Sequence, residues 1–121
     1  MLNIKSDIRN RCYLFSINVI AFIDTLTNKR SVWVITDQLI RSSTSIGANL
    51  VEATAASSRL EYKKYFEIAL KSANETKYWL GLLRDTHLSD KNQTNNLLQE
   101  VTEISKMLGS AVIKLKSKKN F

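Results

Sequence analysis

Residues 36–56, TDQLIRSSTSIGANLVEATAA, decide the fold class of this 121-residue chain. The small and apolar residues of this stretch recur at steps of four and three, which is the spacing of one face of an α-helix. They are Leu39, Ser43, Ile46, Leu50 and Ala53. We expect this helix to begin near Thr36, which can cap it, and to end near Ala56.

Three further segments have apolar residues at the same spacing. They cover about residues 6–28, 58–86 and 89–116. The helix at 58–86 has the clearest start, because Ser58-Arg-Leu-Glu61 matches the capping box. Residues 31–35, SVWVI, have the composition of a strand. Since no partner strand exists in the sequence, we expect these residues to form an apolar connection folded over the end of a bundle.

The architecture follows from the helices and from the shortage of turn residues. The chain has no proline and three glycines, too few for the many tight turns of a β-rich fold. Helices of twenty-odd residues, about 30–40 Å long, joined by short turns pack as antiparallel neighbours. We therefore predict an all-α, antiparallel up-down-up-down four-helix bundle. A single domain covers residues 1–121, and residues 117–121 form a basic tail.

The glycines fall inside predicted helices, where each costs roughly 0.5–1 kcal/mol relative to alanine. They are Gly47, Gly81 and Gly109. We expect each of them to permit close approach of another helix. The residues around Gly47 are almost all small, so this helix can be approached closely from two sides. The bundle core can lie on one side and another subunit on the second.

Catalytic and metal-binding motifs are not found in the sequence. His87 is the single histidine and falls near a helix C-terminus, where a surface role is expected. Cys12 is the single cysteine; it lies on an apolar stripe and is predicted to be a buried hydrophobic residue. A single cysteine excludes a disulfide framework within the chain and fits a reducing cytosol. Di-iron Glu-x-x-His pairs and nucleotide-binding glycine motifs are absent. We expect no enzyme, no metal and no cofactor, and a cytoplasmic location.

A polar stripe lies about 100° from the apolar stripe of the helix at 36–56. It contains Gln38, Arg41, Ser45, Asn49 and Glu52. One interpretation is a solvated face. The other is a partly buried polar ladder that fixes register at an interface. On the second interpretation these residues, together with Gly47, form the contact between subunits.

The charge balance indicates a polyanionic partner. Eighteen Lys and Arg against eleven Asp and Glu give a net charge of +7 and a pI near 9.7. Such a balance favours nucleic acid or an anionic membrane, although lysine can also serve solubility alone. We predict no membrane binding, because the basic residues do not lie opposite an apolar amphipathic side. The candidate nucleic-acid-binding residues are Lys63, Lys64, Lys71, Lys77, Lys114, Lys116, Lys118 and Lys119.

Aromatic residues interleave with these lysines, and an exposed ring can stack on an unpaired base. Tyr62 and Phe66 fall on the core stripe, so we expect them to pack inside the bundle. Tyr65 is left as the stacking candidate.

Three stretches resemble a known family: DQLIRSSTSIGANLVEA at 37–53, Ser58-Arg-x-Glu61, and ALKSANETKYWLGLL at 69–83. They are similar to the bacterial four-helix-bundle proteins encoded in ribosomal-RNA intervening sequences. The accessory protein of diversity-generating retroelements looks like a relative. The resemblance implies a ring-like homopentamer with a basic surface. It also implies a reverse transcriptase as a partner, as for the retroelement relative, which binds nucleic acid.

Two functions are consistent with these features. The first is a non-catalytic, oligomeric accessory protein that binds RNA or DNA through a basic surface. The second is a homo-oligomeric scaffold for protein interactions, for example with a reverse transcriptase, in which the lysines serve solubility alone.

Overall fold

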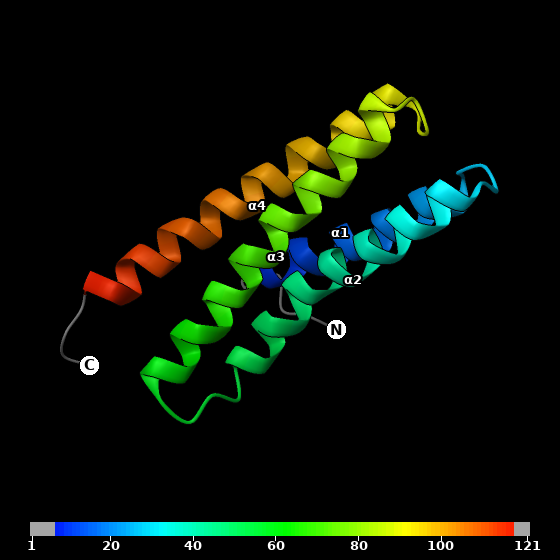
Figure 1. Ribbon diagram of the computed structural model, residues 1–121. Coiled ribbons are helices and arrows are strands. Elements are labelled where there is room, and N and C mark those ends of the chain that lie inside the picture. The colour runs from blue at the N-terminus through cyan, green and yellow to red at the C-terminus, as the bar shows by residue number, and fades with distance from the viewer. Residues whose placement is uncertain (1–6, 118–121) are drawn as a thin grey trace.

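The computed structural model describes residues 7–117 of the chain. It contains four α-helices (Figure 1): α1 Asp7–Asp24, α2 Arg30–Ala53, α3 Arg59–Asp85 and α4 Lys91–Ser117. Each helix packs against the next along the chain, and α4 packs against α1, so that α3 lies diagonally across the bundle from α1. The predicted all-α, antiparallel four-helix bundle is confirmed for the described residues. Residue 6, where the first helix was predicted to begin, lies outside them, as do residues 118–121 of the predicted basic tail.

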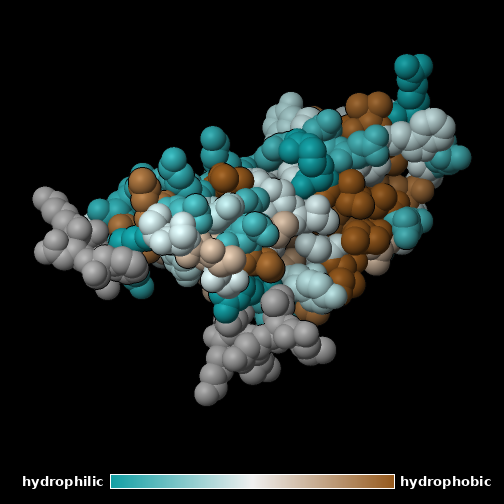
Figure 2. Space-filling view, turned by 90° about the horizontal axis from the view of Figure 1, so that it is seen from below, coloured by the Kyte–Doolittle hydropathy of each residue, from teal (hydrophilic) through white to brown (hydrophobic). Residues whose placement is uncertain are grey.

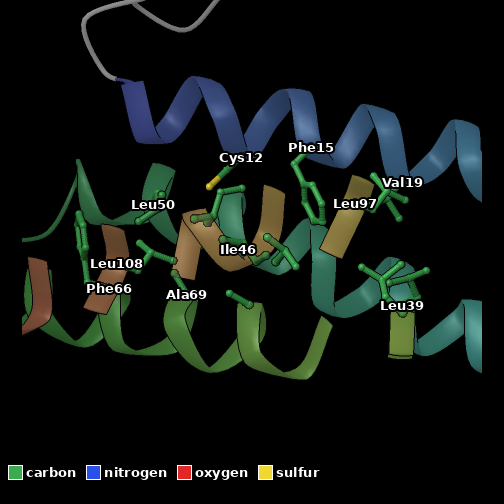
Figure 3. Packing of buried hydrophobic residues seen from close by; sticks show 14 of the residues in the cluster. Cys12, Phe15, Val19, Leu39, Ile46, Leu50, Phe66, Ala69, Leu97 and Leu108 are labelled. Atoms are coloured by element: carbon green, nitrogen blue, oxygen red, sulfur yellow. The ribbon is translucent and has the colours of Figure 1, made fainter. Parts of the chain in front are cut away.

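One continuous hydrophobic core fills the space between the four helices. Figure 3 shows Cys12, Phe15 and Val19 of α1 directed into the bundle, toward side chains of α2. The larger side chains that are almost fully buried come from all four helices. They include Phe15, Leu39, Ile46, Leu80, Leu83 and Leu108. The 4-3 spacing thus identified the core-facing side of each helix correctly.

The start of α2 differs from the prediction. This helix begins at Arg30 rather than near Thr36, and the apolar connection expected at 31–35 is wrong. Val32 is only 3% exposed and extends the buried stripe by one more step of four from Thr36. Burial of Val32 on the core side therefore outweighs the strand propensity of the segment. The Thr36 hydroxyl donates to the Trp33 carbonyl inside the helix instead of capping it.

Helix α1 ends at Asp24 rather than near residue 28. The Thr25 hydroxyl donates to the Phe22 carbonyl at 2.6 Å just after the last residue of the helix. Residues 25–29 form the connection to α2. The Trp33 indole N–H donates to the Asn28 side-chain oxygen at 2.5 Å and ties this connection to the first turn of α2.

Helix α3 has defined caps at both ends. The Ser58 hydroxyl accepts from the Glu61 amide at 3.1 Å, as the capping box predicts, while the Glu61 carboxylate accepts from the amide of Ser57. At the C-terminus, His87 adopts φ 59°, and the Leu88 amide donates to the Leu83 carbonyl. This is a Schellman motif, in which His87 occupies the position that glycine usually fills.

Two other boundaries differ slightly from the prediction. Helix α2 ends at Ala53 rather than near Ala56. Helix α4 begins at Lys91, and the Asp90 carboxylate accepts from the Gln93 amide at 2.9 Å as its cap.

Candidate nucleic-acid interface

The lysines of α3 fall on two sides of the helix. Lys64 and Lys71 are exposed and lie seven residues apart, so they share one side, about 10.5 Å apart along the axis. Lys63 and Lys77 are half-buried and lie fourteen residues apart, two steps of seven, on a second side of the helix. The structure thus brings the four predicted α3 lysines onto one half of the helix surface, away from the core.

A groove of about 300 Å³ extends this basic surface to α4. Arg59, Lys63 and Lys116 line it together with two leucines. Lys116 also lies 3.8 Å from the Glu67 carboxylate. Arg59 was not among the predicted residues; its place in the first turn of α3, one turn before Lys63, is the signal that identifies it.

The remaining predicted lysines do not join this surface in the described residues. Lys114 is exposed on α4, but its position two residues before Lys116 places it about 200° around the helix. Lys118 and Lys119 lie outside the described residues.

Most carboxylates on α3 and α4 are paired with cations. The Arg11 guanidinium binds Glu100 at 2.6 Å and Glu103 at 3.4 Å, and the hydrogen bond to Glu100 raises the pKa of Arg11. Arg41 pairs with Glu75, and Arg84 pairs with Asp85 at 2.8 Å. Hydrogen bonding to Arg84 lowers the pKa of Asp85.

These pairings leave lysine charge unmatched on α3. Within residues 7–117, neither Lys64 nor Lys71 forms an ion pair. The acids one turn away, Glu67 and Glu75, are paired with Lys116 and Arg41, so Lys64 and Lys71 face solvent without an ion-pair partner.

The aromatic residues on α3 are arranged differently from the prediction. Tyr62 and Phe66 pack with their ring centroids 4.9 Å apart, and Phe66 is buried, as expected. Tyr65, the predicted stacking residue, is half-buried against the core. Tyr78 is the exposed ring, at 60%. It lies seven residues after Lys71, and this spacing in the sequence places it on the same side of α3 as Lys71.

The polar stripe of α2 faces α3 of the same chain. Arg41 pairs with Glu75, and the Ser45 hydroxyl accepts from the Ser72 hydroxyl at 3.0 Å. Asn49 donates to Ser45, while Gln38 accepts from Arg41 at 2.9 Å; Glu52 is exposed. A partly buried polar ladder is therefore present, but between two helices of one chain. The role of these residues as a contact between subunits stays a prediction.

The three glycines have different surroundings. A Cβ atom on Gly47 would lie 3.3 Å from the Cβ of Cys12, so the close approach expected there occurs between α2 and α1. At Gly81 and Gly109 an added Cβ would meet nothing within 4 Å. For these two the expected close approach is wrong among the helices that the structure describes.

Cys12 is fully buried, and burial raises the pKa of its thiol to about 12.

Helices α1 and α2 carry an exposed apolar face that the sequence analysis did not predict. Eight of the twelve large hydrophobic residues exposed within the described chain lie on these two helices. They are Tyr13, Leu14, Ile17, Ile20, Trp33, Val34, Ile40 and Val51. Figure 2 shows hydrophobic surface gathered toward the end of the molecule that bears the α1–α2 connection. Charge is scarce along residues 12–28, which contain Asp24 alone, and along residues 42–51, which contain none, whereas residues 29–41 carry Lys29, Arg30, Asp37 and Arg41.

A second groove, of about 390 Å³, lies between α1 and α4. Phe15, Phe22 and Leu97 contribute apolar surface to it, and Glu100, its single ionisable residue, is paired with Arg11.

Within residues 7–117, no group of three His, Cys, Asp or Glu side chains could hold a metal ion. None of the four described helices is both long and apolar enough to cross a membrane.

The fold and this distribution of charge define a small antiparallel four-helix-bundle protein with exposed lysines on α3 and exposed apolar side chains on α1 and α2. A model of the family described as 23S rRNA-intervening sequence protein matches residues 5–110, and the chain belongs to this family. The predicted family is thereby confirmed, while its relation to retroelement proteins stays a prediction.

A solved structure is similar over most of both chains. It is the crystal structure of a protein with unknown function from the S23 ribosomal protein family of Bacteroides thetaiotaomicron VPI-5482. The two sequences are 37% identical, the match covers 87% of this chain and 97% of the other, and the TM-score is 0.81. No curated protein matches the chain.

Proposed function

We propose that this protein is a non-catalytic, homo-oligomeric accessory protein of the bacterial cytoplasm that binds RNA or DNA through α3. The unpaired lysines on the outer side of α3 carry this proposal. Lys64 and Lys71 are exposed without an acidic partner, and Lys63 lies beside Arg59 and Lys116 in the adjoining groove. Lysines gathered on one surface neutralise phosphates and release condensed counterions, which drives sequence-independent binding.

The apolar face of α1 and α2 supports self-association in this proposal. Large exposed apolar surfaces mark interaction sites in soluble proteins. With a net charge of +7, two copies of this chain repel each other wherever lysines meet. Residues 12–28 and 42–51 of this face carry Asp24 as their single charged residue, so a second copy can pack along these stretches with little of that repulsion. A ring-like homopentamer and a reverse transcriptase partner, both implied by the family resemblance, belong to the same proposal.

Electrophoretic mobility shift at 50 and 200 mM salt tests nucleic-acid binding. If the four α3 lysines each contact one phosphate of a single strand, affinity falls about 50-fold between these concentrations, from a slope of about −0.7 per contact. Lys71→Ala should lower the slope by about one contact. Lys29→Ala, an exposed lysine in the α1–α2 connection, is the matched control and should leave the slope unchanged. Absence of any shift at low salt with excess protein would favour the scaffold function instead.

Light scattering on the eluted protein tests the face used for self-association. Ile17→Glu and Ile40→Glu place charge on the apolar face and should reduce the assembled mass. Ile113→Glu on α4, where the side chain is 68% exposed, is the matched control and should keep the mass. An unchanged mass for the two face variants assigns self-association to another surface.

A further inference from the structure

An exposed tyrosine continues the row of exposed lysines on α3. Lys64, Lys71 and Tyr78 follow one another at steps of seven residues, so they lie on the same side of the helix. The row is about 21 Å long at 1.5 Å per residue. Tyr78 is 60% exposed, whereas the other two tyrosines on α3 are half-buried. A polyanion that follows the lysines therefore reaches an aromatic ring.

The ring of Tyr78 is supported from one side. It contacts Trp79 with centroids 5.0 Å apart and planes 77° apart. Trp79 is packed against the core, and its indole N–H donates to the Glu75 carboxylate at 2.9 Å. Glu75 is in turn paired with Arg41 of α2. Because perpendicular rings meet edge to face, this contact uses at most one face of Tyr78, and the residue remains 60% exposed.

The surroundings of Tyr78 leave room for a planar group. Gly81, three residues further along α3, has open space where a side chain would lie. Asn74, four residues before Tyr78, is exposed, and its side chain forms no hydrogen bond within residues 7–117. An amide offers both donors and an acceptor, which suits the edge of a base. The nearest acids on this side, Glu75, Asp85 and Glu67, are each paired with a cation.

An open ring beside phosphate-binding lysines discriminates between unpaired and paired bases. Bases in a duplex are already stacked on their neighbours, and a side chain on a straight helix cannot reach between them without unstacking them. An unpaired base presents its own face and gains from stacking on an aromatic ring.

We infer that the α3 surface binds single-stranded nucleic acid, with one unpaired base stacked on Tyr78 and the strand continuing along Lys71 and Lys64. This inference rests on the proposed nucleic-acid function and names its ligand class. Stacking is tolerant of base identity, so RNA and DNA strands are both ligands of the site.

Fluorescence anisotropy with labelled strands and with duplexes of the same sequence tests the inference, using RNA and DNA in separate titrations. Tyr78→Ala should weaken single-strand binding by about 5- to 150-fold, which corresponds to about 1–3 kcal/mol for one stacked base. Duplex binding should change by less than about 2-fold. Tyr78→Phe keeps the ring and should restore single-strand binding. Ile113→Ala removes another exposed apolar side chain and is the matched control.

The outcomes separate the inference from the function on which it rests. If Tyr78→Ala leaves single-strand affinity unchanged, or weakens strands and duplexes equally, the stacking site is wrong while lysine-dependent binding stands. If the unaltered protein binds neither strands nor duplexes at low salt, the proposed function itself fails and the inference with it. Equal circular dichroism spectra for Tyr78→Ala and the unaltered protein show that the substitution spares the fold.

Discussion

Replacing Gly81 and Gly109 by alanine should stabilise the protein. Both glycines lie in helix interiors, and alanine there is more favourable by about 0.5–1 kcal/mol per site. An added methyl group meets nothing within 4 Å at either position, so no contact opposes the gain. The two sites are on different helices and share no partner, so the double variant should gain about 1–2 kcal/mol.

Gly47→Ala provides the contrast within the same chain. Its methyl group would lie 3.3 Å from the Cβ of Cys12, a tight contact at which α1 would have to give by a few tenths of an ångström. The gain in helix propensity is then offset, and we expect no stabilisation. Gly47→Leu overpacks the α1–α2 contact and should cost about 1–3 kcal/mol or more.

Urea unfolding followed by circular dichroism measures these differences. A gain of 1–2 kcal/mol moves the midpoint of the double variant upward by roughly 0.5–1 M, at a slope near 2 kcal/mol/M. Light scattering on the same samples reports the assembled mass. If Gly81→Ala or Gly109→Ala lowers either the midpoint or the mass, another copy of the chain packs on that glycine, and the reasoning from open space is refuted.

Two further predictions concern single residues. His87→Gly should raise the free energy of unfolding by about 1 kcal/mol, because glycine adopts the left-handed backbone conformation without strain. Thermal unfolding measures this gain. His87→Ala is the control and should show no gain. Cys12 should not react with thiol reagents at pH 8 in the folded protein, since its thiol is buried with a pKa of about 12. The thiol of the unfolded chain ionises at lower pH than the buried thiol. The free energy of unfolding should therefore decrease above about pH 9, by up to about 1.4 kcal/mol per pH unit. A Cys12→Ala variant measured in parallel should lack the decrease that is due to this thiol.

The four helices were predictable because core contacts impose a 4-3 spacing on each helix, whereas half-buried strands alternate with a period of two. Helix ends were less predictable, because they depend on single contacts. The start of α2 shows the reason: the segment around Val32 has β-branched residues that favour a strand locally, and burial of one side chain decides otherwise. The four-residue spacing from Val32 to Thr36 continues the buried stripe in the sequence as well. The strand propensity of residues 31–35 favoured a different interpretation of this segment.

The candidate site was predictable in part. Lysine density on α3 was visible in the sequence, and the spacing from Lys71 to Tyr78 could have identified the exposed ring. The pairing of Arg41 with Glu75 could not be read from sequence, because it depends on the side of α2 that faces α3. The apolar face of α1 and α2 was hidden for a related reason. In a sequence, an exposed isoleucine such as Ile17 cannot be distinguished from a core residue until the helix is rotated into its bundle.

The diagonal placement of α1 and α3 has a consequence for the geometry of any assembly built through α1. Copies joined on that side hold their α3 helices at the periphery, pointing away from the centre. A flexible strand could then wrap around the outside and pass from one copy to the next, each additional contact being intramolecular. Strands too short to bridge two copies would bind with the strength of one site, so affinity would rise abruptly once a threshold length is passed.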